Sequence, residues 1–206
     1  MGFGLCFLGF LLLTMYDVGL DFLGFALIGV GFYRVGKELN TYKGYTVAAY
    51  VAFAAALPAL LNLYDFATVF GLPDLPSAVT MVKGVLISLL SAVLCLGYCG
   101  STSRIAEEGG AKFFSFRAKL TAYVSAFYYA VLAVYGATGA AISGSGASLI
   151  VIGRYLLPLF NAWLLFTCFT TITTKARAVK EEKLIKEELE VLERKRAFKK
   201  KQDEED

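Results

Sequence analysis

The sequence LIVIGRYLLPLFNAWLLFTCFTTI, residues 149–172, decides the class of fold expected for this chain. As an α-helix, these 24 residues would rise about 36 Å, which exceeds the roughly 30 Å thickness of the hydrocarbon core of a bilayer. The stretch contains one charged residue, Arg154, together with Pro158 and Asn161. Because these three residues are spaced by four and then three positions, they share one helix face, which we expect to point into protein. The stretch therefore predicts a membrane-spanning helix with one polar, buried face.

The rest of the chain also has the composition of a membrane protein. Of its 206 residues, 57% are hydrophobic, and the mean hydropathy is +0.62. Both values are too high for a soluble globular domain. Residues 173–206 hold eleven of the 20 basic and ten of the 17 acidic residues. We therefore expect an apolar part made of several spans, followed by a charged tail.

The apolar segments predict an all-α fold, a polytopic transmembrane helical bundle over residues 1–174. Its six spans are expected at about residues 2–16, 21–38, 44–64, 79–100, 118–137 and 148–173, with loops at 66–78 and 101–119. The first two spans form a short hairpin, because a continuous helix would bury Asp17 and Asp21 near the middle of the membrane. Asp21 is the expected N-cap of the second span. The alternative for residues 2–38 is a re-entrant or interfacial hairpin.

Lysine and arginine alternate between the connecting segments in a way that predicts orientation. Segments 34–43 and 101–119 and the tail from residue 175 are rich in these residues, whereas 17–21, 65–78 and 137–148 contain none. Because positively charged loops stay in the cytoplasm, both termini are expected there. The predicted location is a bacterial cytoplasmic membrane.

The tail, residues 175–206, is predicted to be a charged cytoplasmic helix. It lacks Gly and Pro, and pairs such as Glu182 with Lys186 have the favourable spacing of four residues. Its apolar stripe is too short to establish a coiled coil. The tail is either a solvated helix or, over residues 176–206, a site for a protein partner or for self-association.

The predicted orientation brings most charged residues of the spans to the outer side of the membrane. Lys83 lies near the start of its span, where its side chain can reach water by snorkelling. Arg154 is expected to meet a carboxylate, since ionisable groups in a membrane tend to pair. The arrangement is either a structural ion pair or an outward-facing vestibule for an anionic or zwitterionic group. The candidate polar cluster consists of Asp17, Asp21, Asp65, Lys83, Arg154 and Asn161.

Several kinds of chemistry find no support in the sequence. The chain has no histidine, which is the usual general base and the commonest metal ligand. The cysteines lie in apolar segments and are read as buried small hydrophobes of undetermined redox state: Cys6, Cys95, Cys99 and Cys168. We therefore expect no catalytic residues, no metal, no cofactor and no enzyme activity. The basic run in the tail is followed by acidic residues, and nothing indicates nucleic-acid binding.

Three short N-terminal stretches carry a resemblance to a group of proteins. They are Met1-Gly-Phe-Gly-Leu, then Leu8-Gly-Phe, and Gly29-Val-Gly-Phe-Tyr-Arg-Val-Gly before a charged loop. Over about the first 40 residues the chain resembles uncharacterised small polytopic bacterial membrane proteins. The resemblance implies a membrane location and no activity.

The sequence alone thus favours a non-enzymatic integral membrane protein that acts through contacts with the lipid bilayer and, through its tail helix, with a protein partner. The alternative function is a small-molecule or lipid-handling transporter that uses the outer polar cluster. The four tyrosines of the fifth span are interpreted as packing and interfacial aromatics, with ligand stacking as the alternative. They are Tyr123, Tyr128, Tyr129 and Tyr135.

Overall fold

A computed structural model shows that the described part of the chain is all-helical. It describes residues 2–15, 19–68, 70, 73–138 and 148–170. The six helices are α1 (Phe3–Leu13), α2 (Asp21–Glu38), α3 (Lys43–Thr68), α4 (Ser77–Glu108), α5 (Lys112–Thr138) and an unlabelled helix, Ser148–Thr170, called helix 148–170 below. The compact unit Met1–Cys168 contains the packing discussed here; of the second unit, Phe169–Asp206, only Phe169 and Thr170 are described.

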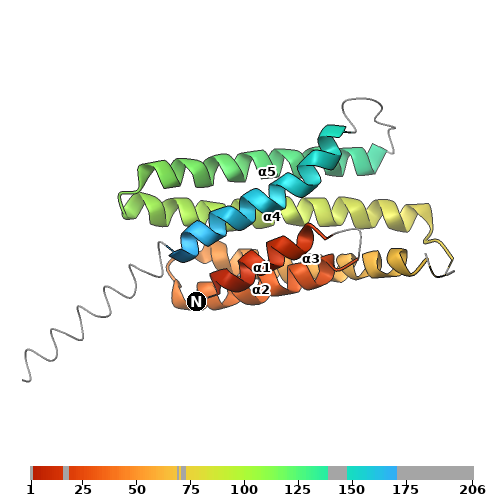
Figure 1. Cartoon of the computed structure of the whole chain (residues 1–206), viewed down its shortest axis with the longest axis horizontal. Coiled ribbons are helices and arrows are strands. Elements are labelled where there is room, and N and C mark those ends of the chain that lie inside the picture. Colours follow the sequence, from red (N-terminus) through yellow and green to blue (C-terminus); the bar gives the residue numbers. More distant parts are fainter. Residues whose placement is uncertain (1, 16–18, 69, 71–72, 139–147, 171–206) are drawn as a thin grey trace, which may run out of the picture. The chain divides into compact units, whose positions relative to one another are not determined.

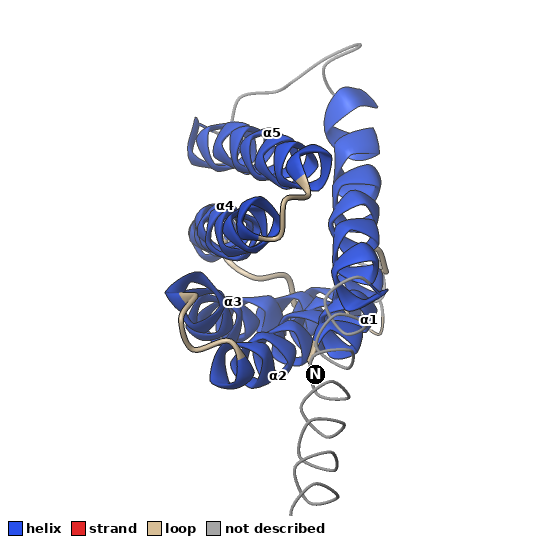
Figure 2. Cartoon of the chain, turned by 90° about the vertical axis from the view of Figure 1, so that its left-hand side faces the viewer, coloured by secondary structure: helices blue, strands red, loops and turns tan. Residues whose placement is uncertain are grey.

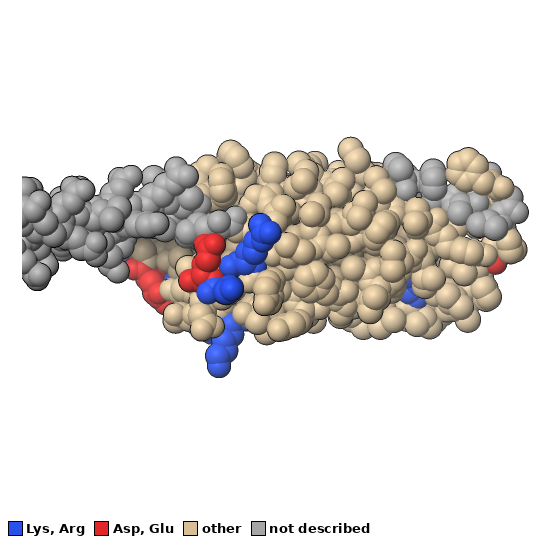
Figure 3. Space-filling view, turned by 90° about the horizontal axis from the view of Figure 1, so that it is seen from below, with Lys and Arg blue, Asp and Glu red and all other residues tan. Residues whose placement is uncertain are grey.

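Four of these helices are long and apolar enough to cross a membrane. They are α3 (over Lys43–Asp65), α4, α5 and helix 148–170. Helix α1 is apolar but has only 11 residues, and α2 has 18 residues with charges at both ends. Figure 3 shows a wide surface band without charged side chains, with Lys, Arg, Asp and Glu gathered mainly toward one end. An integral membrane protein is therefore supported, whereas the count of six spans and the orientation stay predictions.

The helices of the first unit form two layers. Helices α2, α3, α4 and α5 lie side by side in chain order, each packed on the next. Helix 148–170 and α1 lie across one face of this row (Figures 1 and 2). These two helices also meet each other, since the rings of Phe7 and Phe166 are 5.8 Å apart. The ends of the helices that carry the Lys- and Arg-poor connections fall together at one end of the bundle (Figure 1).

Glycines on α2 explain how this helix packs between two neighbours. Gly24 and Gly31, seven residues apart, face α1: a Cβ on Gly31 would lie 2.8 Å from the Gly2 carbonyl oxygen, and one on Gly24 would lie 2.9 Å from that of Gly9. On a second face, Gly29 contacts Phe53 of α3 and Gly36 contacts Thr46 of α3. Since small residues allow membrane helices to approach closely, these spacings hold α1 and α3 against α2.

The structure differs from the predicted loop at 101–119. Helix α4 continues to Glu108 and α5 begins at Lys112, so only three residues connect them. The turn is a Schellman motif, in which the Ala111 amide donates to the Ala106 carbonyl and the Gly110 amide to the Glu107 carbonyl. Gly110 takes the left-handed conformation, with φ 73°. The polar residues of this segment indicate where the helices leave the apolar layer. A helix need not end there, because its backbone groups are hydrogen-bonded within the helix itself.

The predicted loop at 66–78 is also shorter than expected. Helix α3 continues through Pro58 to Thr68, and α4 begins at Ser77, directly after Pro76. Proline commonly lies at the start of a helix, where its missing N–H leaves no bond unmade. Phe66 and Ala67 therefore extend α3 rather than beginning the loop.

Candidate functional site

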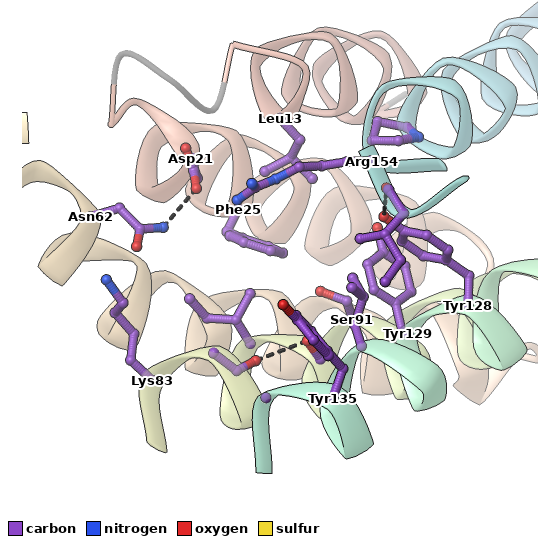
Figure 4. Close-up of a pocket in the computed structure, with 17 residues that line it drawn as sticks. Leu13, Asp21, Phe25, Asn62, Lys83, Ser91, Tyr128, Tyr129, Tyr135 and Arg154 are labelled. Atoms are coloured by element: carbon purple, nitrogen blue, oxygen red, sulfur yellow. Dashed lines mark hydrogen bonds between the residues drawn. The ribbon is translucent and has the colours of Figure 1, made fainter. Parts of the chain in front are cut away.

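A cavity of about 300 Å³ lies between the helices, toward the end that carries the Lys- and Arg-poor connections. All six described helices contribute to its wall (Figure 4). The polar and charged members are Asp21, Asn62, Lys83, Ser88, Ser91, Tyr128, Tyr129, Tyr135 and Arg154. Its size is within the range of small-molecule sites. The described helices thus form a cavity whose wall is mainly apolar but includes charged and amide groups.

Asp21 and Asn62 form the most buried polar pair of this cavity. Their exposed fractions are 4% and 5%, and Asn62 Nδ2 donates a hydrogen bond to Asp21 Oδ2 at 2.7 Å. The second oxygen of each side chain, Oδ1, is buried and accepts no hydrogen bond from the residues that the structure describes. Because an unsatisfied buried polar atom costs about 1–3 kcal/mol, this pair is a costly feature of the cavity wall.

The prediction that Asp21 is the N-cap of its helix is wrong. Leu20 occupies that position, and Asp21 is the first residue of α2, without a side-chain cap bond. Gly19, in the left-handed conformation at φ 69°, closes the preceding turn against the backbone of Asn62. The carboxylate is thereby directed to the amide of Asn62 instead of to its own helix, although its charge still lies at the favourable, positive end of the helix dipole.

The sequence suggested that the Lys83 side chain snorkels to water, but in the structure it does not. Only 5% of its side chain is exposed, and its ammonium forms an ion pair with Asp65, of which 40% is exposed. Residue 65 lies near the end of α3 and residue 83 near the start of α4. The two antiparallel neighbours therefore place the groups at the same depth, and a partner on α3 replaces the water that an isolated lysine would need.

Arg154 reaches the cavity from helix 148–170. Its side chain extends toward α2, on the side of Asp21 and Phe25 (Figure 4). Arg154 and Lys83 are both close enough to Asp21 to act electrostatically on its carboxylate. The face predicted for helix 148–170 does turn inward, since Pro158 is buried and Arg154 is partly buried.

Asn161 lies apart from this group, although the sequence placed it in the same cluster. It is fully buried, accepts a hydrogen bond from Tyr98 Oη and donates from Nδ2 to Ser125 Oγ at 3.1 Å. Seven residues of helix separate it from Arg154, about 10 Å along the axis. Asn161 therefore ties helix 148–170 to α4 and α5 beyond the cavity rather than lining it.

The half of the bundle beyond the cavity is closely packed. Its centre is an aromatic cluster in which Phe32 stacks on Tyr98 at 5.0 Å and on Tyr45 at 5.9 Å. At the far end Tyr42 donates a hydrogen bond to Glu108, and this bond to a carboxylate raises the pKa of Tyr42. The cavity thus lies toward one end of the bundle, with a packed core between it and the other end.

The structure brings together some of the predicted cluster and adds residues that the sequence analysis did not assign. Asp21, Lys83 and Arg154 line one cavity, and Asp65 is bonded to Lys83; Asp17 lies outside the described residues. Asn62 is the main addition, and its signal was an amide within an uncharged span. Three of the four tyrosines of α5 also line the cavity: Tyr128, Tyr129 and Tyr135.

The thiols do not contribute a metal site to the part of the chain that the structure describes. All four cysteines are free and buried, in keeping with their apolar surroundings. Within the described residues, no group of three or more Cys, Asp or Glu side chains is arranged to hold a metal ion.

Comparisons with known proteins add no functional assignment. The chain matches no protein-family model, and neither the curated proteins nor the solved structures give a match.

Proposed function

We propose that this integral membrane protein is a small-molecule or lipid-handling transporter, with the cavity as its binding vestibule. The observation that carries the proposal is that all six described helices contribute to one cavity of about 300 Å³ with charged and amide groups in its wall. Polar and charged groups within a membrane are costly and are found mainly where function or pairing requires them. Asp21 and Asn62 each keep an unsatisfied oxygen there, which a purely structural pair would be expected to bury against a donor.

The position of the cavity supports a transport function over a role in protein contacts alone. It is displaced toward one end of the bundle, and the aromatic cluster and the Asn161 network separate it from the other end. Transporters with sites between membrane helices alternate between states open to one side and to the other. The present arrangement corresponds to one such state, and the charge pattern of the connections predicts that its open side is the outer one.

The interaction role that the sequence favoured for the tail rests on residues 176–206, which lie outside the described residues. No contact among the described residues supports it. The tail role therefore stays a separate prediction, and the vestibule is the better supported basis for function. Catalysis is not proposed: Ser88 of the cavity wall donates its hydroxyl to the Gly84 carbonyl of its own helix, and Lys83 is paired with Asp65.

Cysteine accessibility tests the proposal without knowledge of the substrate. Ser91 lines the cavity and is 3% exposed, whereas Ser125 is fully buried and bonded to Asn161 outside it. In sealed membrane vesicles of both orientations, a membrane-impermeant thiol reagent should modify Ser91→Cys from each side, at different rates. Ser125→Cys is the matched control and should remain unmodified, as should the four buried native cysteines.

Two results would contradict the proposal. If Ser91→Cys reacts no faster than Ser125→Cys from either side, the cavity is not a vestibule. If Ser91→Cys reacts from one side only, under every condition in which the protein remains folded, the cavity is a static binding site and transport is refuted.

A further inference from the structure

We infer that Arg117 of α5 is the centre of a second site, which binds the phosphate group of an anionic phospholipid at the surface of the membrane. Arg117 Cζ lies 4.4 Å from the ring centroid of Trp163 on helix 148–170 and 6.0 Å from that of Phe113 on its own helix. The wall of the cavity includes none of these three described residues. The inference is therefore independent of the proposed transport function.

The depth of Arg117 in the membrane follows from the apolar run beside it. Residues 120–138 of α5 are 19 residues without a charge, which span about 28 Å as a helix. This length matches the roughly 30 Å hydrocarbon core, so Arg117, one turn before the run, lies at the level of the lipid headgroups. Tryptophan is enriched at that level, and more than half of the Trp163 side chain is exposed. Arg117 and Trp163 thus belong to the surface that lipid headgroups contact.

The guanidinium of Arg117 has hydrogen-bond donors that the protein does not use. In the part of the chain that the structure describes, its side chain contacts the two rings but takes part in no ion pair or hydrogen bond. Lys119, two positions further along, instead pairs with Glu107. A ring face attracts the positive charge but leaves the five N–H groups of a guanidinium without conventional acceptors. An anion that reaches Arg117 would accept charge-assisted hydrogen bonds from it.

The charge of this end of the bundle favours an anionic ligand. Segments 34–43 and 101–119 together contain seven basic and three acidic residues. This end is predicted to face the cytoplasm, and anionic lipids of the cytoplasmic leaflet attract basic residues close to the membrane. A planar guanidinium also matches a phosphate group, to which it can donate two parallel hydrogen bonds. The phosphodiester of an anionic lipid is therefore the group that this position and these donors fit best.

Apolar side chains lie where the acyl chains of such a lipid would follow its headgroup. The two helices run antiparallel, since Tyr128 of α5 donates a hydrogen bond to the Ile150 carbonyl at 2.7 Å. Positions three and seven residues from Arg117 or Trp163 lie on the same helix faces, one and two turns further into the membrane. All four of these side chains are apolar and exposed: Leu120 and Val124 on α5, and Phe160 and Leu156 on helix 148–170. A soluble phosphate would leave them unused, whereas a phospholipid covers them.

Trp163 is the only tryptophan of the chain, so its fluorescence reports on this site. The full-length protein is placed in phosphatidylcholine nanodiscs that contain a small fraction of lipid brominated on its acyl chains, because bromine quenches indole fluorescence on contact. The brominated lipid is either phosphatidylglycerol or phosphatidylcholine with identical chains. One arginine near anionic lipid contributes about 1 kcal/mol, or about five-fold in an equilibrium constant. Brominated phosphatidylglycerol should therefore give half-maximal quenching at about one-fifth of the mole fraction that brominated phosphatidylcholine requires.

Variants connect this preference to Arg117. Arg117→Gln should make the two brominated lipids quench equally, whereas the matched control Arg34→Gln, which removes an exposed arginine at the same end, should retain the preference. If Arg117→Gln does not fold, Arg117→Lys, which keeps the charge but loses the planar group, should still lower the preference.

Three results would overturn the inference. They are equal quenching by the two lipids in the unmodified protein, an undiminished preference in an Arg117 variant, and an equal loss of preference in Arg117→Gln and Arg34→Gln. The last result would assign the preference to the overall charge of this end and not to a site at Arg117.

Discussion

Replacing Asn161 by leucine should loosen the attachment of helix 148–170 to the row of helices beneath it. The side chain is fully buried and joins three helices, through Tyr98 Oη on α4 and Ser125 Oγ on α5. Its Nδ2 also donates to the Leu157 carbonyl of its own helix at 2.7 Å. Leucine has a similar shape, so the substitution removes the hydrogen bonds while leaving little cavity.

The size of the effect follows from the two hydroxyl groups that lose their partner. Hydrogen bonds between membrane helices contribute about 0.6 kcal/mol on average and up to about 1.7 kcal/mol. With two such bonds lost, Asn161→Leu should lower the free energy of unfolding by about 1 to 3 kcal/mol. Since about 1 kcal/mol corresponds to 2–4 °C for a chain of this length, the melting temperature in detergent should fall by roughly 5 °C.

A double-mutant cycle isolates the bond to Tyr98. Tyr98→Phe alone should cost about 0.6 to 1.7 kcal/mol, and the double variant should cost less than the sum of the two by a similar amount. Tyr45→Phe is the matched control, because Tyr45 is equally buried but bonds to Thr102 instead. Its cycle with Asn161→Leu should be additive. If the Tyr98 cycle is also additive within about 0.5 kcal/mol, the two side chains are not bonded and the reasoning about this attachment is wrong.

Four further outcomes are expected. Gly31→Ala should cost about 1–3 kcal/mol by overpacking against the backbone of α1, whereas Gly4→Ala, where a Cβ meets nothing within 4 Å, should be neutral or slightly stabilising in the same melting assay; equal effects would argue against the close packing of α1 on α2. Asp65→Asn should cost about 1–3 kcal/mol, less than for a fully buried pair because Asp65 is 40% exposed, and adding Lys83→Met should recover most of the loss; no recovery would mean that the ion pair is not what is broken. Reporter fusions placed after Asn40, Gly71, Gly110, Ser145 and Asp206 should read in, out, in, out, in. An external signal at Gly110 would contradict the topology. Deletion of residues 176–206 should leave insertion and detergent stability near those of the full chain, and aggregation of the shortened chain would show that the tail belongs to the fold.

The helical class of this protein could be predicted from sequence because it depends on local composition. In a bilayer, backbone groups must be bonded within the spanning segment, so a long uncharged run is nearly bound to be a helix. Helix α2 begins and ends at the predicted residues 21 and 38. Helix ends outside the apolar layer were less predictable, since α4 runs to Glu108 and α5 begins at Lys112. There water can satisfy backbone groups, and turn residues such as Gly110 decide where the helix stops.

The glycines of α2 carried a signal that was in the sequence but had no interpretation there. They form two pairs, Gly24 with Gly31 and Gly29 with Gly36, and the two glycines of each pair are seven residues apart on one face of the helix. Only the structure shows that one face meets α1 and the other α3. A small residue permits close approach from any helix, so the spacing alone does not identify the neighbour.

The sequence by itself determined which residues are polar within the apolar segments and on which side of the membrane they are expected. Only the tertiary structure decided which of them meet. Lys83 pairs with Asp65, Asp21 with Asn62, and Asn161 belongs to a separate network. The physical reason is that helical spacing specifies a face and a depth within one helix. The contact between two helices depends on their rotation and on how closely their backbones approach, which the packing of all six described helices sets together.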